Sequence, residues 1–274
     1  MSGGRKRLVC VASGDRFIRQ AALMAGSFLA HNGGWEAVCY ADGGAKLPWW
    51  MERRSLPALL GGHAAFRGFT PFEQCEAGRF LAAAECLGEC GEVLYCDNDL
   101  RWYGQYKCPP DGELLLTPHF LTPKVIHGNR QALQRDGYPN IGLMHFRGKG
   151  GIGLCEDIIR RVEAEPGGNR RKGVLWLQPL LNPAPWLGPE FRTVADPGCN
   201  VGNWNLRKGD RKVVTDGESG QFQVECGGAL HPLTSFHFSR RSFGKLLDGR
   251  FGEAVKSLAK AYLAELRRNV DSRA

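Results

Sequence analysis

Short apolar runs alternate with longer segments of helical periodicity in the first hundred residues of the chain. The apolar runs end at glycine, serine or aspartate, as strands do before a loop. The predicted strands are residues 7–12, 35–40, 64–69 and 92–96, and the predicted helices are residues 17–32 and 71–87. Strands that alternate with helices in this way predict right-handed crossovers and a mainly parallel, Rossmann-like sheet with helices on its faces.

The pattern is looser after residue 100, where glycine and proline separate the periodic segments. Strands are predicted over residues 114–117, 141–146 and 235–239, and helices over residues 152–164, 174–182 and 251–268. The polar stretch 166–172 has the composition of an exposed loop, not of a domain linker. We therefore expect one α/β domain with an irregular second half.

The composition excludes several classes of protein. With 274 residues, of which 43% are hydrophobic and 23% charged, the chain is neither disordered, collagen-like nor a coiled coil. No apolar run approaches the length of a membrane span, and no secretory signal is visible, so the ten cysteines are expected to be buried free thiols in a reducing cytoplasm. Cys86, Cys90 and Cys96 lack the paired spacing of a zinc site.

The net charge of +8 is unevenly distributed along the chain. Residues 1–100 carry 10 basic and 11 acidic side chains, whereas residues 101–274 carry 26 and 17. The excess of +9 in the second part favours an anionic partner there, such as phosphates, an acidic glycan, a membrane surface or nucleic acid.

Two carboxylates, Asp97 and Asp99, directly follow the predicted strand 92–96. In α/β sheets ligands bind beyond the carboxyl ends of the strands, and carboxylate oxygens suit Mg²⁺ or Mn²⁺. The alternative is a solvated turn, because Asp-x-Asp tripeptides are common in turns. Ser13, Gly14 and Asp15 follow the first predicted strand and are therefore expected at the same edge of the sheet.

Motifs in a fixed order strengthen the metal-site interpretation. The segment GEVLYCDNDLRWYG, residues 91–104, resembles the strand and D-x-D element of GT-A-fold glycosyltransferases. Residues 138–147 resemble the N-x-G strand of glycosyltransferase family 8, with Asn140 and Gly142 in the matching places. Residues 175–182 resemble the D-Q-x-x-x-N helix of the family, with Gln178 retained but Leu177 in place of the aspartate. Residues 236–245 resemble its H-F-x-G-x-x-K element. Two more segments, residues 114–120 and 196–206, resemble a less characterised branch of these transferases, and all of these segments follow the family order.

The resemblance implies a metal-dependent enzyme that moves a hexose from a nucleotide sugar to an acceptor hydroxyl with retention of configuration. The donor would be a UDP-sugar such as UDP-glucose or UDP-galactose, and the cofactor Mn²⁺ or Mg²⁺. Asp97, Asp99 and His237 would bind the metal, and Lys245 would meet the diphosphate, with Arg240 and Arg241 as alternatives. Asp99 and Gln178 would act at the reacting centre, Gln178 near the anomeric carbon.

The remaining candidate residues have less specific assignments. In such an enzyme Ser13, Gly14 and Asp15 would meet the base and ribose of the nucleotide, and Asn98 belongs to the nucleotide or diphosphate site. Arg79 is a diphosphate or base contact, or an exposed helix arginine. Contacts to sugar or acceptor are assigned to His119, Asn140, Gly142, Asn200 and Trp204, although His119 and Trp204 fit a buried core equally well. Residues 1–110 would form the nucleotide-binding half, 111–250 the sugar and acceptor half, and 251–268 a C-terminal helix of one GT-A domain, 1–274.

Several alternatives remain open at this point. The acceptor is a glycan or lipid-linked sugar or, given the basic second part, a hydroxymethylated pyrimidine in DNA. A non-catalytic nucleotide- or glycan-binding module is a third hypothesis, motivated by Leu177. The amphipathic segment 253–268 either packs against the protein or attaches it peripherally to anionic lipid.

Overall fold

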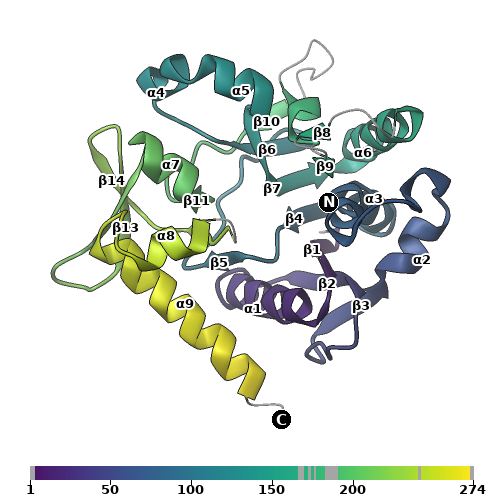
Figure 1. Ribbon diagram of the computed structural model, residues 1–274, viewed down its shortest axis with the longest axis horizontal. Helices are drawn as coiled ribbons and strands as arrows, with labels where there is room; N and C mark the ends of the chain where they lie inside the picture. Colours follow the sequence, from purple (N-terminus) through teal and green to yellow (C-terminus); the bar gives the residue numbers. More distant parts are fainter. Residues whose placement is uncertain are drawn as a thin grey trace.

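The computed structural model describes residues 4–165, 170–171, 174–175, 177–182, 191–239 and 242–271. Its main sheet has seven strands (Figure 1). These are β1 (Lys6–Ser13), β2 (Trp35–Asp42), β3 (Met51–Ser55), β4 (Glu92–Cys96), β6 (Leu114–Pro118), β7 (Pro139–Arg147) and β10 (Phe191–Thr193). They lie in the order β10-β6-β7-β4-β1-β2-β3, and only β7 runs antiparallel to its neighbours. The predicted mainly parallel sheet is confirmed.

Helices cover both faces of this sheet, which explains why β1 is apolar at nearly every position. Leu8 and Cys10 belong to the core under α1 (Asp15–His31). Val9 and Val11 belong to the core on the opposite face, under α3 (Pro71–Glu89) and α6 (Gly148–Ala164), with α2 (Leu56–Gly61) beside them. Because successive side chains of a strand point to opposite faces, a strand between two helix layers must be apolar throughout.

A second, smaller sheet joins the C-terminal part of the chain to the end of β4. Its order is β11-β15-β5, from β11 (Val201–Gly202), β15 (Ser235–His237) and β5 (Leu100–Trp102). Because β5 begins four residues after β4 ends, its antiparallel pairing with β15 brings His237 opposite Leu100. This pairing places the histidine next to the Asp97-Asn98-Asp99 turn.

The remaining short elements belong to neither of these two sheets. An antiparallel sheet is formed by β12 (Lys212–Thr215), β13 (Phe222–Cys226) and β14 (Ala229–Pro232). The short helices are α4 (Pro123–Gly128), α5 (Arg130–Asp136), α7 (Asn203–Lys208) and α8 (Phe243–Leu247), and β8 (Arg170–Arg171) pairs with β9 (Val174–Leu175).

The C-terminal helix α9 (Glu253–Asp271) packs against the protein. Val255, Leu258, Ala259 and Tyr262 on its apolar side are buried, and Gln20 of α1 donates a hydrogen bond to the Tyr262 hydroxyl over 3.3 Å. The helix-packing alternative is therefore confirmed, and this apolar side is not available to a bilayer. No described helix combines the length and apolar content that crossing a membrane would require.

Two predicted elements are wrong. Residues 64–69 contain one 3₁₀ turn, η1 (Ala64–Phe66), and the third parallel strand is β3. The sequence MERRS of β3 does not look like a buried strand because β3 is the edge of the sheet, where one side of the strand meets solvent. The predicted helix 174–182 is replaced by β9 and a 3₁₀ turn, η2 (Gln178–Leu181), and residue 176 lies outside the described residues. Pro179 disfavours the helix because it lacks an amide hydrogen and restricts the backbone of the residue before it.

Candidate metal centre and surrounding pocket

The Asp97-Asn98-Asp99 turn is fixed by the backbone on both sides. The Asp97 amide donates to the Gly142 carbonyl over 2.8 Å, and the Phe238 amide donates to the Asp99 carbonyl over 2.8 Å. Asn98 points elsewhere, because its side-chain amide donates to the Val11 carbonyl at 3.3 Å. The turn therefore directs Asp97 and Asp99 to one place, which favours the metal-site interpretation over a solvated turn.

His237 completes a three-residue cluster with the two aspartates. Its Nε2 lies 2.9 Å from Asp99 Oδ1 and 3.9 Å from Asp97 Oδ2. One ligand atom from each of the three residues lies within 4.8 Å of the others. Two carboxylates and an imidazole form a donor set that suits Mn²⁺ or Mg²⁺ and leaves further coordination positions for phosphate oxygens or water.

Gly142 of β7 makes the close approach of these side chains possible. A Cβ atom at this position would stand 2.5 Å from His237 Cε1, 2.8 Å from Asp97 Oδ2 and 2.9 Å from Asn140 Oδ1. Any larger residue would thus displace the cluster. The glycine of the N-x-G segment contributes space, not a ligand.

The charges within the cluster favour a bound cation. Burial lowers the pKa of His237, but the Asp99 and Asp97 carboxylates together raise it more, so the net shift is upward. Burial raises the pKa of Asp99, but His237, a backbone hydrogen bond and Arg79 together lower it more, so the net shift is downward. The two side chains form an ion pair in the metal-free protein, and a divalent cation would replace the proton on His237.

Arg79 lies behind Asp97 and is buried, so the alternative of an exposed helix arginine is wrong. Its Nη1 lies 3.5 Å from Asp97 Oδ1 and donates to the Ile141 carbonyl over 3.0 Å. Its guanidinium also binds Glu76, whose pKa burial raises to about 7. Arg79 contributes positive charge and holds Asp97 against β7.

Tyr95 is a site residue that the sequence did not reveal. Its hydroxyl donates to Asp97 Oδ1 over 3.0 Å, and its ring packs against the Arg79 guanidinium at 5.3 Å. Its position two residues before Asp97 is the one sequence feature that points to it, because residues i and i+2 of a strand share a face. Tyr95 therefore fixes one oxygen of Asp97.

Asn200 orients the imidazole of His237. Its Nδ2 donates to Thr117 Oγ1 over 2.6 Å and to Asn140 Oδ1 over 3.1 Å, and its Oδ1 lies 3.2 Å from His237 Nδ1. With Nδ1 donating to Asn200, Nε2 faces the carboxylates. Asn200 has φ +50°, a left-handed conformation that asparagine tolerates better than most residues. Asn200 therefore positions His237, and its predicted contact with sugar or acceptor stays a prediction.

We expect Asn200→Gly to weaken Mn²⁺ binding by about 10- to 100-fold, the usual effect of losing a residue that orients a metal ligand. Glycine adopts φ +50° without strain, so the backbone is retained while the hydrogen bond to His237 is lost. Titration with Mn²⁺ followed by electron paramagnetic resonance measures the affinity, and circular dichroism checks the fold. Parental Mn²⁺ affinity in a folded Asn200→Gly variant would contradict the positioning role.

His119, Gln178 and Trp204 form a connected group beside the cluster. His119 Nδ1 lies 3.0 and 3.1 Å from two backbone carbonyls, so it carries the proton, and His119 Nε2 accepts from Gln178 Nε2 over 3.4 Å. Gln178 Oε1 in turn accepts from the Ile141 amide over 3.3 Å. The Trp204 ring stands edge-on to His119 at 5.8 Å and to His237 at 5.1 Å. Within the described part of the chain its buried indole Nε1 has no hydrogen-bond partner.

The predicted nucleotide residues after β1 hold the protein's own loops. Ser13 Oγ donates to Asp42 Oδ2 over 3.4 Å, and Asp15 Oδ1 accepts from the amides of Gly44 and Ala45, both over 2.8 Å. Gly14 precedes α1 with φ +89°. Asp15 is thus a structural residue of the β2–β3 loop, and its contact with a nucleotide stays a prediction.

The residues predicted to contact the diphosphate lie near the C-terminal end of the chain. Lys245 is exposed on α8, and its neighbour Leu246 is buried. Arg240 and Arg241, the alternatives to Lys245, lie outside the described residues.

The comparisons with known proteins support this arrangement at the level of the fold. No protein-family model matches the sequence, and no curated protein is similar to it. Among solved structures the chain is similar to the galactosyltransferase LgtC in complex with donor and acceptor sugar analogues, with a TM-score of 0.56. The sequence identity is 13%, and the match covers 93% of this chain and 95% of the LgtC chain. The chain has the GT-A fold. An active-site variant of LgtC gives a TM-score of 0.56 at 12% identity over 84% of this chain and 86% of that chain.

Proposed function

We propose that this GT-A chain is a metal-dependent glycosyltransferase that moves a hexose from a UDP-sugar to an acceptor hydroxyl. The observation that carries the proposal is the convergence of Asp97, Asp99 and His237 within 4.8 Å at the end of β4. The similarity to LgtC, a galactosyltransferase solved with donor and acceptor sugar analogues, supports the reaction class.

The proposed metal site would act on the leaving group. A divalent cation bound there stabilises the negative charge that develops on the departing nucleotide diphosphate. Asp97, Asp99 and His237 hold that cation, and Tyr95 and Asn200 fix the orientation of Asp97 and His237. Because these side chains are oriented before any ligand binds, little reorganisation is needed when the diphosphate arrives.

Gln178 and Trp204 are the proposed sugar contacts. The Gln178 amide is held at both ends, by His119 and by the Ile141 amide, so it presents a fixed polar group. One solved LgtC structure carries a substitution of an active-site glutamine, which supports an equivalent role for Gln178. The Trp204 ring, which stands edge-on to His119 and to His237, would line the proposed sugar or acceptor site beside Gln178.

At Leu177 the sequence departs from the family motif, so the family's sugar preference does not carry over to this chain. It stands where the family motif has aspartate, and it is buried in the apolar core. No carboxylate contacts the sugar from this position. We therefore propose that the hexose preference differs from that of family members with the aspartate.

A turnover assay with UDP-glucose and UDP-galactose tests the proposal. We expect UDP release in the presence of Mn²⁺ and none after chelation with EDTA. The melting temperature should rise with UDP-sugar and Mn²⁺ together, because a ligand that binds only the folded state stabilises it. A thermal shift without UDP release, with or without a sugar acceptor, would identify a binding module instead. No shift and no turnover with either sugar would contradict the proposed function.

A further inference from the structure

An exposed tryptophan marks a surface away from the metal centre. Residues 43–50 connect β2 to β3, and Trp49 in this loop is 95% exposed, more than any other large apolar side chain in the described part of the chain. Exposing a whole indole ring to water is unfavourable, since burying such a ring removes a large apolar area from water. The exposed ring therefore needs an explanation.

The base of this loop is held firmly. Asp15 accepts the amides of Gly44 and Ala45, and the Arg53 guanidinium donates to the carbonyls of Gly43 and Ala45, the latter over 2.7 Å. At the other end of the loop the Met51 amide donates to the Pro48 carbonyl over 3.1 Å, which closes a turn that contains Trp49. Both ends of the loop are therefore held by hydrogen bonds.

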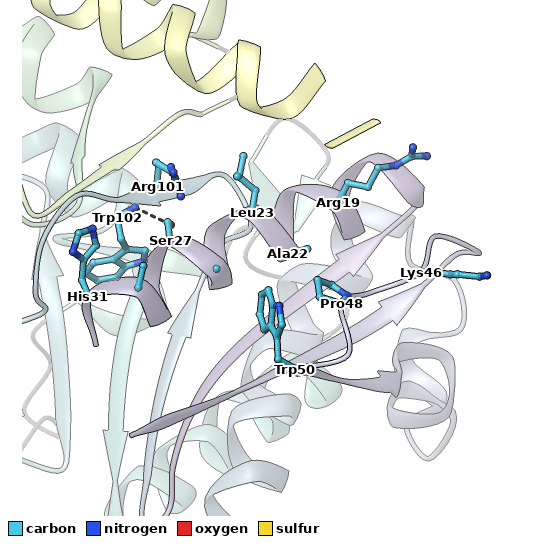
Figure 2. Close-up of a pocket in the computed structure, with 12 residues that line it drawn as sticks. Arg19, Ala22, Leu23, Ser27, His31, Lys46, Pro48, Trp50, Arg101 and Trp102 are labelled. Atoms are coloured by element: carbon cyan, nitrogen blue, oxygen red, sulfur yellow. Dashed lines mark hydrogen bonds between the residues drawn. The ribbon is translucent and has the colours of Figure 1, made fainter. Parts of the chain in front are cut away.

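A basic cleft of about 460 Å³ lies between this loop and α1 (Figure 2). Arg19 and Lys46 stand toward one end of it, and His31 and Arg101 toward the other, with Trp50 in the loop wall. Glu265 pairs with Arg101 over 2.9 Å and balances its charge, and Asp15 binds the loop amides. The net positive charge of the cleft therefore lies at the end formed by Arg19 and Lys46.

We propose that this loop and cleft dock the protein on an anionic lipid bilayer. Trp49 would enter the headgroup region, where tryptophan is enriched in membrane proteins, while Arg19 and Lys46 would meet lipid phosphates. Trp49 stands between Pro48 and Trp50, which line the same cleft as Arg19 and Lys46, so the exposed indole and the two cations belong to one surface. An exposed aromatic ring beside basic side chains is the combination found on proteins that bind at the membrane–water interface. The proposal does not depend on the proposed transferase activity.

Co-sedimentation of the full chain with vesicles tests this docking surface. We expect binding to phosphatidylcholine vesicles that contain phosphatidylglycerol, weakened by added salt, and little binding to phosphatidylcholine alone. Trp49→Ala should reduce the affinity at least about fivefold, and Lys46→Glu about tenfold, since each basic residue contributes to attraction by the anionic surface.

Matched controls separate the surface from general effects. Leu230→Ala removes another exposed apolar side chain, 59% exposed on β14, and Lys124→Glu makes the same charge change on α4, far from α1 in Figure 1. Both should change the affinity less than about twofold. Equal binding to both kinds of vesicle, parental binding by Trp49→Ala, or equal loss in the controls would overturn the proposal. UDP-sugar turnover in solution, which Trp49→Ala should leave unchanged, reports separately on the proposed function.

Discussion

Replacing Asp99 by asparagine is expected to abolish Mn²⁺ binding in the micromolar range and to lower UDP-sugar turnover by about 10²–10³-fold, the loss typical of removing one group that stabilises developing charge. Asp99 is the closest carboxylate to His237, at 2.9 Å. The substitution keeps the size of the side chain and removes one anionic ligand. It also removes the charge that raises the pKa of His237.

Asp97→Asn should have a similar effect on Mn²⁺ affinity, because Asp97 presents Oδ2 to the cluster while Tyr95 and Arg79 hold its Oδ1. Electron paramagnetic resonance with Mn²⁺ gives the affinity, and the rate of UDP release gives the turnover. Asp111→Asn is the control, since this carboxylate is 61% exposed and pairs only with Arg192 at the surface among the described contacts. Mn²⁺-dependent turnover at the parental rate in Asp99→Asn would rule out the proposed metal site.

The main sheet was predictable because burial on two faces demands continuous apolar runs. Residues 92–96 were predicted to be a strand, and β4 has these same bounds. The edge strand β3 was missed because neither of its faces is fully covered, which permits an exposed Arg53 on one face and Arg54, paired with Glu85 and Glu89, on the other. Periodicity thus reports burial, and it fails where a strand lies at the sheet edge or where a proline such as Pro179 shortens a helix.

The site was predictable only through the order of motifs. No spacing rule connects Asp99 to His237 across the chain; the antiparallel pairing of β5 with β15 does so. Sequence reasoning placed Asn200 at the sugar or acceptor, whereas its hydrogen bonds lead to His237, Thr117 and Asn140. A left-handed backbone and a hydrogen-bond network depend on tertiary contacts that no local pattern encodes.

The distribution of charge was predicted only in part. The excess of +9 after residue 100 pointed to an anionic partner of the second half. In the structure the basic cleft draws Arg19 and Lys46 from the first hundred residues and Arg101 from the next segment. The net charge of a sequence segment does not predict the charge of a surface patch, because folding brings side chains from distant segments together.

Gly142→Ala is expected to lower Mn²⁺ affinity at least about 100-fold and to destabilise the fold by about 1–3 kcal/mol, the usual cost of overpacking. The added methyl would stand 2.5 Å from His237 Cε1 and 2.8 Å from Asp97 Oδ2. β7 is hydrogen-bonded to strands on both sides, so its backbone cannot withdraw, and the ligands must move instead. Mn²⁺ titration and thermal unfolding measure the two effects.

The control for this substitution is Gly153→Ala on α6, where nothing lies within 4 Å of the added Cβ. That variant should be more stable than the parent by up to about 1 kcal/mol, because alanine favours the helix, and it should bind Mn²⁺ unchanged. Since both variants add one methyl group to a glycine, their difference isolates the contact with His237 and Asp97. Parental Mn²⁺ affinity in Gly142→Ala would show that the cation binds elsewhere, because the crowded glycine matters only if these two side chains meet over it.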